Sequence, residues 1–350
     1  MQRANQILIG LVLSMLAWAA AADVPRTSSG KPDLSGTYNV ATLTPLERPE
    51  EFGDNLYLTP AEAQKITDKQ ASDRADAHQV SDPNRTAPPP GGDGSPGAAG
   101  NVGGYNSFWI DNGDDPSILD GKFRTSIITY PQNGRQPPMT ASGQQRMAGF
   151  LTLFKENTGT AWWLDQAGPG PYDDMELRPN AERCMLSFGS TSGPPMLPSA
   201  YNNLKRVVQT ESHVMILAEM IHDARVIRLD GEHNPSEHRT WMGDSVGHWE
   251  GDTLVVDTTN FGPKPALLGA DSNLHVIERF TRLEDGNLKY AFTVDNRESW
   301  ETSWGGEYPW PRTDDKVYEY ACHEGNYALG NIMRGARILE ADIEGVGGQE

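Results

Sequence analysis

Residues 214–231 read VMILAEMIHDARVIRLDG, and residues 241–259 read WMGDSVGHWEGDTLVVDTT, with a polar loop between them. Apolar residues that favour strands alternate here with ionisable ones, and this is the densest strand signal in the chain. Because β-forming residues fit a pleated, half-buried surface, the stretch predicts strands of a sheet with one polar face. Its ionisable residues are Glu219, His222, Asp223, Arg225, Asp244, His248 and Glu250.

Further strand signals surround this stretch. Runs typical of strands cover 205–210, 275–282 and 288–294, and a last run covers 316–324. Short turns that contain Gly or Asp separate several of them, and this spacing is typical of an antiparallel meander. We therefore expect a mainly β fold, in which the meander closes into a barrel.

The N-terminal half predicts helices and long loops rich in Gly and Pro. A capping box, Thr59-Pro60-Ala61-Glu62, begins a polar helix, and a capping signal at Ser142 begins another. Residues 86–105 are dominated by Pro and Gly, which is typical either of a disordered surface loop or of a loop that closes over a pocket. A terminal helix follows the last strand, over 326–339.

We expect residues 23–200 to form a helical and loop-rich extension that also contains the first strands. Residues 201–350 would form the antiparallel β core. A length of 328 residues after residue 22 is compatible with one domain that includes both parts.

The first 22 residues have the layout of a signal peptide. Arg3 precedes an apolar run over 7–18, and Ala20-Ala21-Ala22 supplies small residues before Asp23. The alternative is a membrane anchor, but the run is shorter than the roughly 20 residues that a spanning helix needs. We expect cleavage after Ala22, a periplasmic or secreted chain, and no membrane insertion after cleavage.

The chain is strongly acidic, with 48 Asp and Glu against 29 Lys and Arg and a formal net charge of −19. A surface of this charge repels phosphate groups, so nucleic acid is not an expected partner. The same repulsion disfavours docking on anionic lipids. The partner that we expect is a small molecule, and the composition says nothing about the oligomeric state.

The two cysteines are Cys184 and Cys322. A secretory route leads to an oxidising compartment, where two remaining cysteines often pair, so we predict a disulfide between them. Two buried free thiols are the alternative. Neither cysteine has the CxxC spacing that a zinc site or a redox site requires.

Strand alternation suggests which ionisable residues share a face. If the strand stays regular, Glu219, Asp223 and Arg225 lie on one face and His222 on the other. A bulge or turn at 221–223 would change this. In the last strand, Glu319 and His323 fall on one face, opposite Tyr320 and Cys322.

Carboxylates and an imidazole in a partly apolar cavity have shifted pKa values, which suit proton transfer. The predicted catalytic residues are therefore Glu219, Asp223, His323 and Glu319, with Arg225 to hold a carboxylate or enolate oxygen. The alternative is structural, because Glu–Arg and Asp–Arg pairs on neighbouring strands are often cross-strand ion pairs.

Aromatic residues are concentrated in the C-terminal half. The segment WETSWGGEYPWPRT, over 300–313, is polar and broken by Pro and Gly, so we expect an aromatic rim rather than a core strand. Such a rim favours a ligand that contains a ring or resembles a sugar. The predicted ligand-binding residues are His222, Trp241, Asp244, His248 and Tyr320.

Metal and cofactor signals are weak. His233 and His238 lie on one loop, with His248 and His323 as further possible ligands, but the spacing is not HExxH and Pro235 interrupts any helix. No parallel βαβ alternation appears in the sequence, and it contains no P-loop, so we expect no cofactor and no metal. Gly243-Asp244-Ser245-Val246-Gly247 resembles a nucleophile elbow only loosely.

Several segments together resemble a large family of secreted bacterial proteins of uncharacterised function. They are PDLSGTY, ERC at 182–184, GPPMLPSAYNN, EMIHDARVIRLDG, WMGDSVGHWEGDTLVVDTTNF, ERFTR and YEYACHEGNY. The resemblance covers most of the chain after residue 22 and implies no reaction or catalytic residue. The arrangement of an early strand and a later meander is also similar to lipocalin-like barrels, at the level of the fold only.

Three functions remain open from the sequence. The first is a cofactor-independent acid–base enzyme (a lyase, isomerase or hydratase) that acts on an aromatic or polycyclic hydrophobic substrate. The second is a lipocalin-like protein that binds its ligand without catalysis. The third is a metal-dependent hydrolase that uses the loop histidines.

Overall fold

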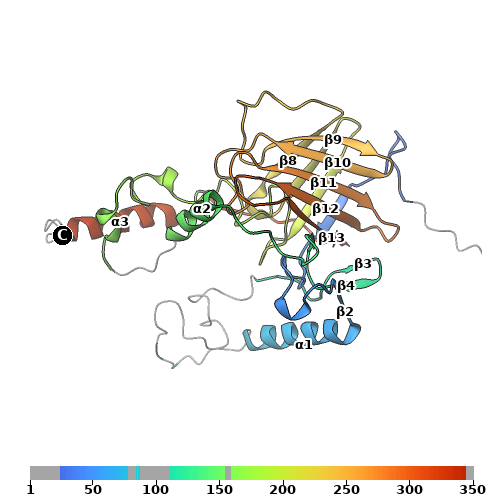
Figure 1. Ribbon diagram of the computed structural model, residues 1–350, viewed down its shortest axis with the longest axis horizontal. Helices are drawn as coiled ribbons and strands as arrows, with labels where there is room; N and C mark the ends of the chain where they lie inside the picture. Colours follow the sequence, from blue (N-terminus) through green and yellow to red (C-terminus); the bar gives the residue numbers. More distant parts are fainter. Residues whose placement is uncertain (1–23, 78–83, 85, 87–109, 154–158, 344–350) are drawn as a thin grey trace, which may run out of the picture.

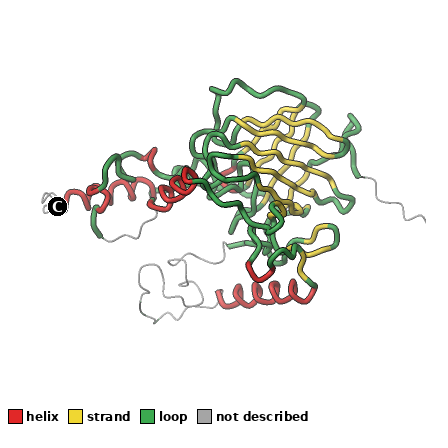
Figure 2. Tube along the Cα trace, viewed as in Figure 1, coloured by secondary structure: helices red, strands yellow, loops and turns green. Residues whose placement is uncertain are grey.

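The computed structural model describes residues 24–77, 84, 86, 110–153 and 159–343 (Figure 1). These residues form three α-helices, a large sheet of eleven strands and a small sheet of three, so the protein is mainly β (Figure 2). The predicted signal peptide lies outside the described residues, as does the Pro- and Gly-rich segment 86–105 apart from Thr86.

The large sheet follows chain order over most of its width. From β6 to β13 each strand pairs with the next one along the chain, as a meander requires. The order is β14 (Arg312–Thr313), β1 (Gly36–Asn39), β6 (Leu204–Gln209), β7 (His213–Ala218), β8 (Ala224–Leu229), β9 (Asp244–Glu250), β10 (Thr253–Thr259), β11 (His275–Arg282), β12 (Leu288–Asp295), β13 (Trp304–Trp310) and β5 (Ile128–Tyr130).

One junction departs from the predicted antiparallel meander. β8 and β9 pair in parallel, with Ile227 opposite Ser245, whereas the other paired strands of the described residues are antiparallel. A parallel pair needs a connection that returns to the starting end of the sheet. The 230–243 loop is long enough to make that return, and the polar sequence between the two strands becomes this crossover.

β14, at one edge of the large sheet, directly follows β13, which lies next to the other edge strand, β5. β13 and β14 are separated by Pro311 alone, and the backbone N–H of Asn39 in β1 donates to the Pro311 carbonyl over 2.9 Å. Within residues 304–313, β13 therefore pairs with β12, and β14 pairs with β1.

The core contradicts the predicted aromatic rim. Trp300, Trp304 and Trp310 are at most 1% exposed and pack with the main hydrophobic cluster. The sequence predicted no core strand here because the segment contains glycines. In the structure these glycines are required, because a side chain at Gly305 or Gly306 would collide with the backbone of the neighbouring strand or loop. These glycines allow β13 to pair closely on both sides.

The helices α1 and α2 begin near the predicted capping signals, but the capping residue of α2 differs from the predicted one. In α1 (Pro60–Ala77), Thr59 and Glu62 make the reciprocal hydrogen bonds of the predicted capping box. In α2 (Ala141–Thr152) the cap is Thr140 rather than Ser142, since its hydroxyl accepts from the Gly143 N–H. The terminal helix, α3, covers Ala328–Ile343.

Shorter elements complete the fold. The small sheet lies beside α1 and contains β2 (Tyr57–Leu58), β3 (Ile118–Leu119) and β4 (Lys122–Arg124), as Figure 1 shows. The single-turn 3-10 helices are η1 (Glu50–Phe52), η3 (Trp162–Asp165), η4 (Met175–Leu177) and η5 (Met220–His222).

The predicted last strand, over 316–324, is wrong. This segment is irregular and mostly exposed, and it connects β14 to α3. Its position is set by a disulfide between Cys184 and Cys322, which confirms the predicted pairing. Such a bond implies an oxidising, extracytoplasmic environment.

α3 projects away from the sheet together with the segment around η3 and η4 (Figure 1). A second, small hydrophobic cluster joins them, built on Trp163 and Ala336, and Trp163 Nε1 donates to Glu340 over 2.6 Å. None of the described helices is long and apolar enough to cross a membrane.

Replacing each of two glycines of α2 with alanine should change the free energy of unfolding in opposite directions. A methyl group at Gly143 would collide with the Ser299 carbonyl oxygen, whereas at Gly149 no described atom lies within 4 Å. We expect Gly143→Ala to lower the free energy of unfolding by about 1–3 kcal/mol, through forced backbone movement. Gly149→Ala should raise it by about 0.5–1 kcal/mol, because glycine is a poor helix former. Urea denaturation followed by circular dichroism measures both, and equal effects would contradict the packing of α2 on Ser299.

Candidate functional site

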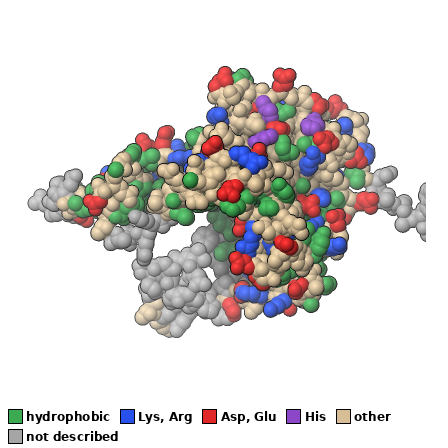
Figure 3. All heavy atoms as spheres, viewed as in Figure 1, with side chains coloured by type: hydrophobic (Ala, Val, Ile, Leu, Met, Phe, Trp, Pro, Cys, Tyr) green, Lys and Arg blue, Asp and Glu red, His purple; other side chains and the backbone are tan. Residues whose placement is uncertain are grey.

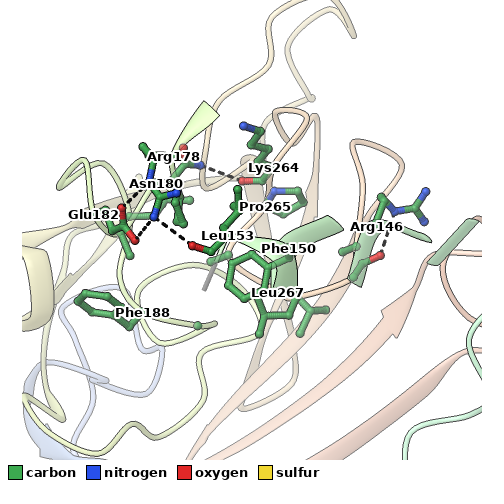
Figure 4. A pocket seen from close by; sticks show the side chains of 18 of the residues that line it. Arg146, Phe150, Leu153, Arg178, Asn180, Glu182, Phe188, Lys264, Pro265 and Leu267 are labelled. Carbon is green, nitrogen blue, oxygen red and sulfur yellow. Dashed lines mark hydrogen bonds and ion pairs between the residues drawn. The ribbon is translucent and has the colours of Figure 1, made fainter. Parts of the chain in front are cut away.

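The clearest cavity lies outside the sheet, between α2, the 177–189 segment and the loop over 263–270 (Figure 4). Its volume is about 460 Å³. That size is within the range of sites for drug-sized ligands, roughly 300–1,000 Å³. Most of its wall is apolar, with Phe150, Leu153, Leu177, Leu186, Phe188 and Leu267 among the lining side chains.

One end of this cavity is polar. Arg178 forms a two-point ion pair with Glu182, with both N···O distances at 2.9 Å, and also donates to the Leu153 carbonyl. Beside it in Figure 4, Asn180 Nδ2 donates to the Lys264 carbonyl over 3.1 Å. Arg178 Nη1 and Asn180 Oδ1 are buried, and neither has a hydrogen-bond partner within the described part of the chain. Unpaired buried polar atoms are rare in native proteins and call for an explanation.

A buried polar cluster adjoins the cavity wall. Ser187 lines the cavity, and its hydroxyl oxygen accepts from Ser192 Oγ over 2.8 Å. The neighbouring Thr191 accepts from Lys205 Nζ over 3.1 Å. Lys205 is 0% exposed, and burial lowers its pKa to about 7, although Glu219 and Asp223 act in the opposite direction.

Asp223 belongs to the same cluster. Burial raises the pKa of its carboxyl group, although the Ser192 hydroxyl, His222 and Lys205 partly offset the effect. Its Oδ2 atom is buried, and no hydrogen bond satisfies it among the described residues. Burial thus shifts the pKa values of Lys205 and Asp223 in opposite directions, and groups with perturbed pKa values are common at functional sites.

A strained turn brings Asp223 to this place. β7 ends at Ala218, so regular alternation does not continue to 225, and the structure has the alternative, a turn at 221–223. Ile221 and His222 both have positive φ angles, of 61° and 48°, a conformation that is strained for a β-branched residue. The Ala218 N–H donates to the Asp223 carbonyl over 2.8 Å and closes the turn.

Arg225, predicted beside Glu219 and Asp223, faces the sheet interior. Its guanidinium group pairs with Glu278 on β11 through N···O distances of 2.6 and 3.2 Å. The two side chains are 2% and 0% exposed, and the Tyr290 hydroxyl also donates to Glu278. Arg225 is thus engaged in a buried, three-membered network of the core.

The two segments predicted to meet, about 100 residues apart, do lie together. The Tyr318 N–H donates to Glu219 over 3.0 Å, and His222 Nδ1 lies 3.0 Å from the Tyr320 carbonyl oxygen. Glu319 and His323, however, are exposed. Glu319 and Tyr320 line a second, more polar pocket, of about 540 Å³.

The other predicted ligand residues lie elsewhere. His248 is exposed on β9 and faces Glu250, and the Trp241 ring lies against Gly262. Asp244 is buried under the 230–243 loop, where burial raises its pKa but hydrogen bonds from Arg228, Asn234 and His233 dominate and hold it at about 2. The structure therefore brings together Glu219, Asp223, His222 and Tyr320 and separates them from Arg225, Asp244 and His248.

The loop histidine His233 takes part in an ionic chain on the outer face of the sheet, where Figure 3 shows histidine side chains next to acidic ones. Its two ring nitrogens lie 3.1 and 3.0 Å from Asp244 and Asp257, and His275 Nε2 lies 3.1 Å from Asp257. No group of three His, Cys, Asp or Glu in the described residues is arranged to hold a metal ion.

Sequence reasoning missed the residues of the cavity. Arg178, Asn180 and Ser187 belong to the loop-rich extension over 23–200, in which no catalytic or ligand-binding residue was predicted. Lys205 could have been noticed, because it stands at an inward position of a strand whose other inward residue, Val207, is apolar. No periodicity marks the loop residues, so their convergence is visible only in three dimensions.

No protein-family model matches this sequence, and no curated protein matches it. The resemblance to secreted bacterial proteins stays a prediction. The candidate site therefore stands on its geometry alone.

Replacing Arg225 should destabilise the core strongly. Arg225→Met would leave the Glu278 carboxylate buried without its cation, and we expect a loss of about 3–5 kcal/mol in the free energy of unfolding. The double variant with Glu278→Leu should recover most of it, because the isolated charge is removed. Arg279→Met, whose partner Glu250 is exposed, is the control and should cost less than about 1 kcal/mol. Guanidinium denaturation measures all three.

His275 should make stability depend on pH. The hydrogen bond to Asp257 raises the pKa of His275, so the pair stabilises the fold below the ordinary histidine pKa of about 6.5. That contribution is lost as the pH rises through the raised pKa of the folded protein. His275→Gln should therefore reduce stability more at pH 5.5 than at pH 8.5, by at most about 1 kcal/mol, since the pair is partly exposed. Thermal unfolding at both pH values, with His238→Gln as control, tests the difference.

Proposed function

We propose that the protein is an extracytoplasmic enzyme that takes a ring-containing, largely apolar molecule into the cavity beside α2 and converts it by acid–base chemistry without a cofactor. The observation that carries the proposal is this apolar cavity, together with two ionisable residues, buried Lys205 and half-buried Asp223, whose pKa values burial shifts in opposite directions. A lyase, an isomerase or a hydratase would each use such an arrangement.

The volume of the cavity and its apolar lining suit an apolar ligand. A volume of about 460 Å³ accommodates a molecule of two or more fused rings. Removing apolar surface from water favours binding by roughly 25 cal/mol per Å². Phe150 and Phe188 add aromatic faces against which a ring can pack.

The polar end of the cavity favours a hydroxyl group on the ligand. Arg178 Nη1 offers a donor, and Asn180 Oδ1 offers an acceptor, because the Asn180 amide nitrogen is already engaged with Lys264. A hydroxyl group both accepts and donates, so a small adjustment at this end would satisfy both atoms. A carboxylate would satisfy Arg178 alone and would be repelled by Glu182.

The disulfide and the sheet support the remaining parts of the proposal. A bond between Cys184 and Cys322 is consistent with a secreted or periplasmic chain. Pairing of residues 304–313 with both β12 and β1 supports a sheet that curls into a barrel-like form. We propose a barrel whose interior is filled by side chains, with the ligand outside it.

Filling the cavity should abolish binding of an apolar probe. Gly149 lines the cavity and has open space at its Cβ position, so Gly149→Phe should place a ring there without disturbing α2. We expect the affinity for 2-naphthol, measured by calorimetry, to fall at least about tenfold. Gly330→Phe, on α3, has the same free space and is the matched control.

The preference for a hydroxyl group on the ligand is tested by comparing the affinities of two probes. The protein should bind 2-naphthol about 2–10 times more tightly than 2-methoxynaphthalene, which cannot donate, as one net hydrogen bond predicts. Asn180→Leu should remove much of this difference. Equal binding of 2-naphthol to Gly149→Phe and Gly330→Phe would contradict the assignment of the cavity.

Binding without catalysis is the alternative function. If the protein abstracts a proton from a carbon atom of the ligand, the ligand exchanges that hydrogen for deuterium in D₂O. Incubation with a panel of bicyclic and tetracyclic alcohols and ketones, followed by mass spectrometry, should show deuterium uptake or a gain or loss of water. Ligands recovered unchanged, although bound, would favour a binding protein.

A further inference from the structure

The cavity contains one carboxylate. Among the described residues that line it, only Glu182 carries an acidic side chain, while Arg146, Arg178 and Lys264 carry cations. A guanidinium group keeps its proton in proteins, and the exposed Lys264 ammonium group donates to the Glu176 carbonyl over 3.0 Å. Glu182 is therefore the lining group that can accept a proton from a ligand.

A group that exchanges a proton with the ligand must lie within hydrogen-bond reach of it. Lys205 and Asp223 do not line the cavity, so a residue of the wall has to carry out this step. Glu182 remains able to do so although Arg178 binds it at two points, over 2.9 Å each. A carboxylate offers about four acceptor positions, and this pairing uses two of them.

Arg178 is held so that one of its nitrogens remains for a ligand. Its Nε and Nη2 atoms bind Glu182, Nη2 also donates to the Leu153 carbonyl over 3.3 Å, and the guanidinium carbon lies 4.9 Å from the centre of the Tyr172 ring. Nη1 is buried, and no hydrogen bond satisfies it within the described part of the chain. A ligand oxygen that accepts from Nη1 would share this guanidinium group with the Glu182 carboxylate.

Asn180 adds an acceptor at the same end of the cavity (Figure 4). Its Nδ2 atom faces the Lys264 carbonyl, so its buried Oδ1 atom is the one left without a partner among the described residues. A ketone oxygen would accept from Arg178 and leave Asn180 unpaired. An enol hydroxyl group accepts from Arg178 and also donates to Asn180. This end is thus complementary to an enol rather than to its ketone.

We propose that the cavity takes a ring-containing ketone and converts it through its enol, with Glu182 as the base and with Arg178 and Asn180 holding the oxygen. This proposal rests on the proposed function, because it assigns a substrate class and catalytic residues to the same cavity. An enzyme gains rate when it binds the transition state better than the substrate. Two polar atoms that the ketone satisfies only in part, and the enol satisfies fully, supply such a difference.

Each step leaves atoms and charges balanced. The Glu182 carboxylate takes the proton from the carbon next to the carbonyl group, the electron pair of that C–H bond forms a C=C bond, and the C=O π electrons move to oxygen. Arg178 stabilises the negative oxygen. Glu182, now a carboxylic acid, returns the proton to the oxygen and gives the enol. Return of the proton to another carbon of a conjugated ketone gives its double-bond isomer, so no other reactant is consumed.

The first measurement compares a ketone with a permanent enol. 2-Tetralone is a bicyclic ketone that enolises, whereas the aromatic ring of 2-naphthol fixes the corresponding hydroxyl group. We expect calorimetry to show that 2-naphthol binds about 2–10 times more tightly, as one additional net hydrogen bond predicts. Asn180→Leu should bring the two affinities close together. Equal affinities in the unaltered protein would overturn the complementarity to an enol.

The second measurement follows deuterium uptake by 2-tetralone in D₂O, by mass spectrometry. The protein should accelerate uptake over buffer, and Glu182→Gln should reduce the acceleration at least about 100-fold, because the base is lost. Binding of 2-naphthol to this variant should change less than about threefold, since the glutamine oxygen still accepts from Arg178. Glu176→Gln, whose side chain is 78% exposed in the preceding turn, is the matched control and should leave the rate unchanged.

The outcomes distinguish this inference from the proposed function. If Glu182→Gln accelerates uptake as well as the unaltered protein does, another group is the base, and the inference is overturned while the cavity remains assigned. If both probes bind and uptake is not accelerated, the enol step is overturned, and binding without catalysis is favoured. If neither probe binds, the proposed function is wrong, and the inference with it. Should Glu182→Gln not fold, the two affinities and their response to Asn180→Leu still decide.

Discussion

The buried pairing of Arg225 with Glu278 is the interaction on which the rest of the arrangement depends. It joins β8 to β11, and Tyr290 of β12 completes it. Two charges at this depth are tolerated only when each is hydrogen-bonded, and separation of the pair would be costly. Around them, the aromatic side chains of the inner face occupy the enclosed space. The cavity of about 460 Å³ accordingly lies outside the sheet, between α2 and two loop segments.

That location gives the site an unusual construction. Its walls come from α2, the 177–189 segment and the 263–270 loop, and its polar groups Arg178, Asn180 and Glu182 belong to the 177–189 segment. Loops supply the variable surface, while the sheet behind them provides rigidity. The disulfide between Cys184 and Cys322 ties the cavity-lining segment to the chain that leads into α3. Oxidation of this pair thus supports the cavity as well as the fold.

The fold could be predicted from the sequence better than the site. The strands 224–229 and 275–282 have the predicted bounds, because alternation of apolar residues is a local property. The segment 300–313 was misinterpreted, since Gly305 and Gly306 weaken a strand locally but allow close pairing with its neighbours. The segment 316–324 has a strand-like pattern, yet a disulfide and single hydrogen bonds hold it as an irregular connection.

The sequence by itself determined the mainly β character, the order of the meander, the capping of α1 and the pairing of the two cysteines. Each of these follows from short-range patterns or from the count of one residue type. Only the tertiary structure decided that Arg225 belongs to the core, that a turn follows β7 before Asp223, and that Arg178 and Asn180 share a cavity. These placements depend on two left-handed residues and on loops without periodicity, whose positions are set by long-range packing.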